Sequence, residues 1–320
     1  MAHSPFFDPA PAVTDPASGS TSDLARVAAL QLIVALIWGG TWIAGRILAH
    51  EISPIAAGGW RFLLGTLTLG VLVWRTERRI PPLDAKNAWR VFVMGAVGIF
   101  AYSLCFFFGL QHIQAGRGAL VVALNPVAVA LAAALFLGER LTPKKSLGVA
   151  IAMLGCLIVV GRGDPFALLR GEVGLGELLI IGCVIGWTIY TLIGRRAGGT
   201  LSPLVMTFYA SVAGGALLIA TGIITGPLRQ WPQLSWQGWL SLLYLGVLGS
   251  GFSYVWYAHG VVRLGATRAA AFINFVPISA LVFGVLLLGE HVGLAVLAGG
   301  VLVLGGVWLT NRPTTKKELR

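Results

Sequence analysis

The stretch Gly116–Glu139 reads GRGALVVALNPVAVALAAALFLGE, an apolar run with a proline near its middle. It returns late in the chain as Thr267–Glu290, TRAAAFINFVPISALVFGVLLLGE, and both copies end in Leu-Gly-Glu. Pro126 recurs as Pro277, 151 residues later, at the same place in the copy. The chain therefore contains an internal repeat, and each copy carries a proline inside an apolar stretch.

Each of these prolines is expected near the middle of a membrane. Pro126 follows Arg117 by nine residues, which at about 1.5 Å per helical residue places it roughly 14 Å into the run. A bilayer core is about 30 Å thick. Proline removes a backbone donor and clashes with the preceding turn, so we predict helix kinks with freed carbonyls at Pro126 and Pro277. Two such kinks, one per repeat, are where a transporter would build its binding site.

The composition is that of a polytopic membrane protein. Hydrophobic residues make up 57% of the 320 residues and charged residues 11%, whereas about a quarter of an ordinary soluble domain is charged. The length accommodates about ten spans of about 20 residues each. The net charge of +11 does not indicate a nucleic-acid partner, because the basic residues lie in short loops between apolar runs. We therefore expect a lipid bilayer as the environment and no nucleic-acid partner.

We predict an all-α fold of ten transmembrane helices in two five-helix repeats. Residues 25–161 form the first repeat and residues 174–310 the second. Residues 1–24, rich in Pro, Ala, Ser and Asp, are interpreted as a disordered tail without a cleavable signal, and residues 311–320 as a C-terminal tail. The expected spans are 25–48, 54–74, 88–110, 116–137, 145–161, 174–194, 203–225, 236–257, 267–288 and 292–310.

The two repeats are expected to be inverted relative to each other. They match over their whole length, since Trp38 also recurs as Trp187. Five is an odd number of spans, so the second repeat must begin on the opposite side of the membrane. With the N-terminus inside, 17 of the 23 Lys and Arg fall on the inner side and 5 in outer loops. The positive-inside rule then predicts that both termini are cytoplasmic.

Acidic residues are absent from the centres of the expected spans. Of the twelve Asp and Glu, Glu177 alone lies a few residues inside one, near its end. Proton- and sodium-coupled carriers usually use an intramembrane carboxylate, because it can change its charge or hold a cation. We infer that any transport is downhill or coupled by another group. Glu139 and Glu290 lie where spans meet water, and we interpret them as loop-folding residues.

Arg61 is the one cation well inside an expected span. It follows Pro54 by seven residues, which places it roughly 10 Å deep. Burying a charge is costly, which favours an aqueous cavity or an anionic partner such as a substrate carboxylate. The alternative is an arginine that extends to the outer interface. The repeat equivalent is Ala210, so the repeat itself does not require a cation here.

Aromatic residues recur at spacings of three or four, which places each pair on one helix face. Turned inward, these faces would line an amphipathic cavity for a small organic solute; the alternative is an interfacial or lipid-facing position. Asn125 and Asn274 lie beside the two kinks, where each can bind either a substrate or a freed carbonyl. The aromatic pairs are Trp38 and Trp42, Tyr102 and Phe106, Trp187 and Tyr190, and Tyr254 and Tyr257.

The sequence indicates no cofactor, no metal site and no catalytic centre. The three cysteines lie in apolar spans at unrelated spacings, and no two histidines have the spacing of metal ligands. A membrane enzyme would need a nucleophile–base pair or a metal cluster within the spans, and none is found. The oligomeric state is not set by the sequence, which is compatible with a monomer.

Several motifs together identify a family. They are the Trp-Gly opening of the first span, Ser53-Pro54 with Arg61-Phe62 in the second, the kink prolines and the two Leu-Gly-Glu stops. With these, residues 28–310 resemble the EamA family of the drug/metabolite transporter superfamily. The resemblance implies a ten-span carrier of the bacterial inner membrane with inverted five-span repeats, exporting amino acids or related metabolites by alternating access.

Within that family, Tyr102–Cys105 and Trp187 look like the corresponding stretches of YddG-type aromatic amino-acid exporters, whereas Asn125 replaces the aromatic residue expected there. We therefore predict an exporter of neutral, hydrophobic or aromatic amino acids that moves about the Pro126 and Pro277 kinks. Arg61 or helix ends would meet the carboxylate of the small-molecule substrate. The alternatives are a carrier for a nucleoside, vitamin or drug-like compound, and a non-transporting membrane subunit.

Overall fold

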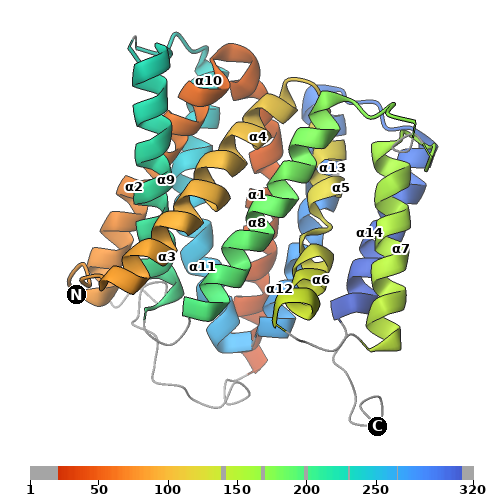
Figure 1. The fold of residues 1–320 in the computed structure, drawn as a ribbon, viewed down its shortest axis with the longest axis horizontal. Helices are drawn as coiled ribbons and strands as arrows, with labels where there is room; N and C mark the ends of the chain where they lie inside the picture. Colours follow the sequence, from red (N-terminus) through yellow and green to blue (C-terminus); the bar gives the residue numbers. More distant parts are fainter. Residues whose placement is uncertain are drawn as a thin grey trace.

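The computed structural model describes residues 21–137, 142–166, 170–197, 201–229, 231–264 and 266–311. Within these residues ten helical segments are long and apolar enough to cross a membrane, as the sequence predicts. The third and fourth spans of each repeat are built from more than one helical element. Figure 1 shows the resulting bundle. We call the end of the bundle that holds the start of α1 and the end of α14 the lower end, and the opposite end the upper end.

The elements of the first repeat are α1 (Thr21–Glu51), α2 (Pro54–Glu77), α3 (Ala85–Gly95), η1 (Ala96–Ala101), α4 (Tyr102–Leu110), α5 (Ala115–Val122), α6 (Asn125–Leu137) and α7 (Pro143–Val160). Those of the second are α8 (Leu175–Ala197), α9 (Pro203–Thr225), α10 (Trp236–Leu243), η2 (Tyr244–Phe252), α11 (Ser253–Leu264), α12 (Ala266–Ile273), α13 (Phe275–Leu288) and α14 (Leu294–Asn311). The elements η1 and η2 are π-helical segments in the middle of the third span of each repeat.

Helix starts follow local signals in the sequence. The Thr142 hydroxyl accepts a hydrogen bond from the backbone N–H of Lys145, and proline follows it in the first turn of α7. Ser202 caps α9 in the same way before Pro203. Such side chains satisfy N–H groups that have no partner in the first turn, and proline lacks the N–H that would be unsatisfied there. One boundary differs from the prediction, since α1 begins at Thr21, inside the stretch assigned to the tail.

The two repeats interlock rather than lie side by side as separate halves. The first helix of each repeat, α1 or α8, contacts the third and fourth spans of the other repeat. The second spans, α2 and α9, contact each other, as do the fifth spans, α7 and α14. The last pair lies at one edge of the bundle (Figure 1) and is very close. A Cβ atom on Gly155 would lie 2.6 Å from the carbonyl oxygen of Gly299, so only glycine fits there.

The fourth span of each repeat is interrupted directly before its proline. Helix α5 ends at Val122 and α6 begins at Asn125, so Pro126 lies in the first turn of the second piece. In the other repeat, Asn274 separates α12 from α13, and Pro277 again follows within a turn. A proline has no N–H to donate to the carbonyl four residues earlier. The two interruptions are therefore the freed-carbonyl positions that the prolines predict.

Candidate functional site

A cavity of about 560 Å³ lies between the two repeats. Both fourth-span interruptions contribute to its wall, including Pro126 and Pro277. Nine of the eleven residues that the sequence suggested for binding line this cavity: Trp38, Trp42, Arg61, Tyr102, Asn125, Trp187, Tyr190, Tyr254 and Asn274. These residues come from both repeats, so a molecule in the cavity would contact both.

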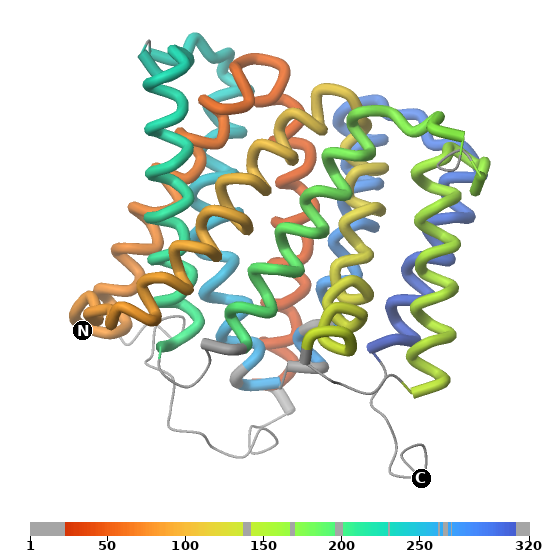
Figure 2. The backbone as a smooth tube through the Cα atoms, viewed as in Figure 1, coloured from red at the N-terminus to blue at the C-terminus, as the bar shows by residue number. Residues whose placement is uncertain are grey.

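The cavity reaches the lower end of the bundle. Its wall includes Lys145 in the first turn of α7, Arg195 near the end of α8, and Asn311 at the end of α14. Figure 2 shows that these helix ends lie at the same end of the bundle, the end where α1 begins. The charged residues of the cavity wall are Arg61, Lys145 and Arg195, all basic. No acidic residue among the described ones lines it, so the cavity is electrostatically positive.

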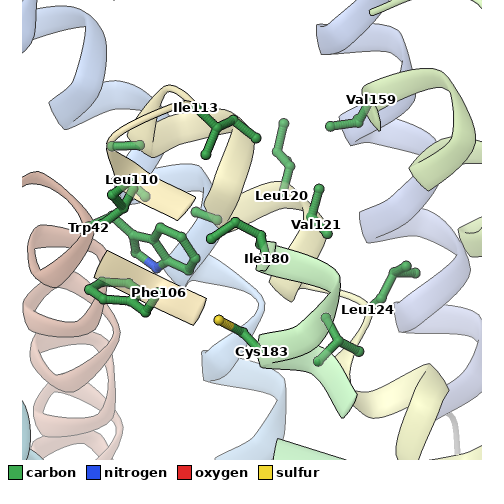
Figure 3. Close-up of a cluster of buried hydrophobic side chains, with 14 of the residues drawn as sticks. Trp42, Phe106, Leu110, Ile113, Leu120, Val121, Leu124, Val159, Ile180 and Cys183 are labelled. Carbon is green, nitrogen blue, oxygen red and sulfur yellow. The ribbon is translucent and has the colours of Figure 1, made fainter. Parts of the chain in front are cut away.

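A hydrophobic cluster closes the cavity on its upper side. Figure 3 shows the Trp42 ring of α1 between Phe106 and Leu110, two side chains of α4. The ring centroids of Trp42 and Phe106 are 5.0 Å apart. Trp42 is 4% exposed and belongs both to this cluster and to the cavity wall. The cluster therefore separates the cavity from the upper end of the bundle.

Above this cluster, Glu290 joins the two repeats. Its carboxylate oxygens accept hydrogen bonds from the backbone N–H groups of Ala115 at 2.6 Å and Gly116 at 3.0 Å, at the start of α5. Arg46 of α1 lies 3.7 Å from the same carboxylate. Gly289, with φ of +62°, turns the chain so that Glu290 can fold back toward α13. The interpretation of Glu290 as a loop-folding residue is therefore incomplete, because its carboxylate also joins the two repeats. Its repeat equivalent Glu139 lies outside the described residues.

A second buried ion pair lies near this end. Arg117 donates a hydrogen bond to Glu177 of α8, and Arg162 lies 3.6 Å from the same carboxylate. Glu177 is 1% exposed, and Arg117 is also buried. The sequence placed Arg117 in an outer loop, but it lies in the first turn of α5. This pair also joins one repeat to the other.

Arg61 occupies the cavity wall. Its Nε donates a hydrogen bond to the Ser250 hydroxyl at 3.1 Å. The carbon at the centre of its guanidinium group lies 5.2 Å from the ring centroid of Phe62 and 5.5 Å from that of Phe106. Contacts of a guanidinium with aromatic faces are attractive and leave the hydrogen-bonding edge of the group free. Arg61 therefore lies at the cavity, as the first of the two alternatives predicts, and does not extend to the outer interface.

Aromatic rings from both repeats form much of the remaining wall. Trp38 contacts Tyr254, with ring centroids 5.7 Å apart, and its indole N–H donates to the Gly249 carbonyl at 3.2 Å. Tyr102 contacts Trp187 at 6.4 Å, and Trp187 stacks on Tyr190 at 5.4 Å. Flat, rigid rings of this kind bind apolar groups and offer a polar edge. The wall can therefore hold a small amphipathic molecule.

Two of the suggested binding residues do not line the cavity. Phe106 is 2% exposed and lies behind Trp42 in the hydrophobic cluster. Tyr257 is not among the residues of the cavity wall, and its ring contacts Trp38, with ring centroids 5.4 Å apart. Their helical spacing relative to Tyr102 and Tyr254 is correct, but each lies a turn further along the helix, where neighbouring helices cover it. We therefore withdraw both as binding candidates.

The two asparagines lie at the helix interruptions, on the cavity wall. The side-chain oxygen of Asn125 is buried and has no hydrogen-bond partner among the residues that the structure describes. An unsatisfied buried acceptor is costly, which makes it a candidate partner for a bound molecule. The backbone N–H of Asn274 donates to the Ala271 carbonyl at 3.3 Å, closing the last turn of α12. Within the described residues, no group of three His, Cys, Asp or Glu could hold a metal ion.

Sequence reasoning missed Ser250 and Gly249, which contact Arg61 and Trp38. The available signal is the run Gly246–Gly251, which contains four small residues opposite the Arg61 span. Small residues in membrane helices usually indicate close helix contacts. The run therefore indicated a close contact without indicating its partner.

Comparisons with known proteins agree on one family. A sequence model of the EamA-like transporter family matches residues 26–161 and again residues 174–312. The uncharacterized transporter YyaM of Bacillus subtilis is 28% identical over 273 residues, covering 85% of this chain and 89% of that protein. A protein of Streptantibioticus cattleyicolor named "probable terminal-alkyne amino-acid exporter" is 31% identical over 290 residues, covering 88% of this chain and 92% of that protein. A chain in a solved crystal structure has the same fold, with a TM-score of 0.60 and 21% identity over 89% of this chain and 98% of that chain.

Proposed function

Because the chain belongs to the EamA-like transporter family, we propose that it exports neutral, hydrophobic or aromatic amino acids, or similar small metabolites, by alternating access. Family membership makes it a multi-pass membrane transporter rather than an enzyme. The substrate class is our inference. It is supported by a cavity that combines one deep guanidinium group, Arg61, with aromatic rings and no described acid.

The chemistry of the cavity fits each part of such a substrate. The Arg61 guanidinium would bind the carboxylate, since charge-assisted hydrogen bonds to arginine are among the strong ones. Trp187 and Tyr190 would contact an apolar side chain. If the Asn125 amide rotates, its oxygen, which has no hydrogen-bond partner among the described residues, can accept a hydrogen bond from a polar group of the substrate. A cationic molecule would meet repulsion from the basic wall, so cations are the least suitable substrates.

The polar network at the upper end supports the alternating-access part of the proposal. In the described state the cavity reaches the lower end, and the Trp42 cluster and the Glu290 contacts close it above. From the positive-inside count we infer that the lower end is cytoplasmic, and we propose the bacterial inner membrane as the location. The described state would then be the one in which an exporter takes up its substrate. Opening the upper end requires the Glu290 contacts between the repeats to separate.

The relative from Streptantibioticus cattleyicolor, named "probable terminal-alkyne amino-acid exporter", also favours an amino-acid substrate. Counterflow in liposomes tests the proposal. The purified chain is reconstituted with unlabelled phenylalanine inside, and uptake of labelled phenylalanine, threonine or a nucleoside is followed. We expect saturable accumulation of phenylalanine and little of the nucleoside. Accumulation of the nucleoside alone would assign the cavity to another metabolite class.

A further inference from the structure

The position of Arg61 is fixed from the opposite repeat. Arg61 belongs to α2 of the first repeat, whereas its hydrogen-bond acceptor Ser250 belongs to η2 of the second. The Ser250 side chain is buried, and the residue is 1% exposed. Ser250 takes the Nε–H of Arg61, and the two terminal nitrogens have no hydrogen-bond partner among the described residues. The end-on edge of the guanidinium is therefore available for a ligand.

The backbones of α2 and η2 pack closely beside Ser250. A Cβ atom on Gly65 would lie 2.9 Å from the Cβ of Ser250. A Cβ atom on Gly246 would lie 2.6 Å from the Cβ of Leu64 and 3.1 Å from the carbonyl oxygen of Arg61. The distances of 2.9 Å and 2.6 Å are shorter than real Cβ contacts, so glycine is required on each side. Close backbone contact thus fixes the spacing of the two helices that carry Arg61 and Ser250.

The same π-helical segment also holds a second cavity residue. The Gly249 carbonyl accepts the indole N–H of Trp38 at 3.2 Å, one residue before Ser250. A π-helical segment carries an extra residue per turn and is frequent at functional sites. Segment η2 therefore positions one cation and one aromatic ring of the first repeat, both of which line the cavity.

We propose that Ser250 is a positioning residue that makes Arg61 specific for a carboxylate. An arginine can bind a carboxylate through Nε and one terminal nitrogen, or end-on through both terminal nitrogens. Because Ser250 accepts the hydrogen bond from Nε, a carboxylate can form two parallel hydrogen bonds to Arg61 only end-on, through both terminal nitrogens. The inference rests on the proposed function, because it assigns the bound carboxylate to this edge of Arg61.

Three probes separate carboxylate recognition from general binding: phenylalanine, 3-phenylpropanoate, which keeps the carboxylate but lacks the ammonium group, and 3-phenylpropanamide, a neutral compound that lacks both. Each competes with labelled phenylalanine in counterflow. In Ser250→Ala, we expect the apparent affinities for phenylalanine and 3-phenylpropanoate to fall about tenfold. The affinity for 3-phenylpropanamide should stay within about twofold of wild type.

Two further variants distinguish positioning from a structural role. In an Arg61→Gln background, Ser250→Ala should have no additional effect on either carboxylate, because residues acting through one contact are not additive. Ser241→Ala removes another buried hydroxyl of the same span that does not line the cavity, and it should leave all three affinities unchanged. Gly65→Ala, which pushes on Ser250 while keeping its hydroxyl, should reproduce the carboxylate-specific loss.

The outcomes separate this inference from the proposed function. If wild type recognises neither phenylalanine nor 3-phenylpropanoate, the proposed function fails and this inference falls with it. If wild type recognises both but Ser250→Ala loses all three probes equally, or loses none, the transporter proposal stands and the role of Ser250 is overturned. An additive effect of Ser250→Ala in the Arg61→Gln background would also overturn it.

Discussion

The carboxylate of Glu290 accepts a hydrogen bond from the backbone N–H of Ala115 at 2.6 Å, although 175 residues separate them. A helix start has unsatisfied N–H groups and a partial positive charge, so a buried carboxylate there is stabilised by both. Here the helix start belongs to one repeat and the carboxylate to the other. The contact therefore reports directly on whether the two repeats are together at the upper end.

Glu290→Gln is expected to open the upper end more often. The substitution removes the negative charge that holds the α5 start and Arg46, and hydrogen bonds to charged groups contribute about 1.5–3 kcal/mol each. In a variant whose native cysteines are replaced, a cysteine at the cavity position Val122 can be labelled by an impermeant maleimide. We expect faster labelling from the upper side in Glu290→Gln than in its parent.

Glu51→Gln provides the control for this experiment. Glu51 also joins the repeats at the upper end, through the Ser235 hydroxyl at 2.6 Å, but this contact is exposed. Exposed contacts contribute little, so labelling should barely change. Equal labelling of Glu290→Gln and its parent would show that Glu290 does not hold the upper end closed.

Arg61→Gln should weaken binding of amino acids about 10- to 100-fold, the equivalent of losing a charge-assisted hydrogen bond of about 1.5–3 kcal/mol. Arg61→Lys should rescue only part of this loss, because an ammonium group cannot form the planar pair. Competition against labelled phenylalanine measures both. If Arg61→Gln bound phenylalanine with wild-type affinity, Arg61 would not be part of the binding site.

Glu177→Gln should destabilise the protein. Glu177 is 1% exposed and compensates the buried Arg117, and leaving one partner of a buried pair uncompensated costs about 3–5 kcal/mol. We expect the unfolding temperature in detergent to fall by about 5 °C or more. Glu172→Gln, in an exposed pair with Arg170, should leave it unchanged. A fall of the same size in both variants would contradict this account of the buried pair.

Pro126→Ala and Pro277→Ala should slow transport more than they affect stability. Alanine restores the N–H that can bond to the Val122 or Ile273 carbonyl, which favours a continuous helix across the interruption. Counterflow rates should fall severalfold, with an unfolding temperature equal to or above that of wild type. Transport at the wild-type rate in the double variant would mean that the interruptions are not needed for the movement.

Transport should carry no protons with it. The acids among the described residues lie away from the cavity wall; Glu77, for example, binds the Ser202 hydroxyl at 3.0 Å near the lower end. A pH-sensitive dye inside proteoliposomes should report no change during net phenylalanine uptake down its own concentration gradient between pH 6 and 8. A proton flux abolished by a single Asp or Glu substitution would contradict this expectation.

The fold and the aromatic and proline residues of the cavity wall could be predicted because they depend on local patterns. Apolar run length sets the spans, and Pro126 and Pro277 break their helices wherever they occur. The depth of Arg61 likewise follows from its distance to Pro54. Phe106 could not be distinguished from Tyr102 in this way, because both share a helix face and the covering Trp42 comes from another helix.

Contacts between distant segments were beyond the reach of these patterns. Glu290 was interpreted as a loop residue because its partners, Ala115 and Gly116, lie in the other repeat. Ser250 gave no signal of its own, since a serine in a small-residue run is usual in membrane helices. Both residues make contacts across the interface between the repeats, and the spacing of residues along the sequence does not reveal such contacts.

A structure determined with phenylalanine bound tests the central claim most directly. We predict the carboxylate of phenylalanine on the terminal nitrogens of Arg61, the Ser250 contact intact, and the ring beside Trp187 and Tyr190 in the cavity between the repeats. A phenylalanine bound elsewhere, with the cavity filled by side chains or lipid, would contradict the account.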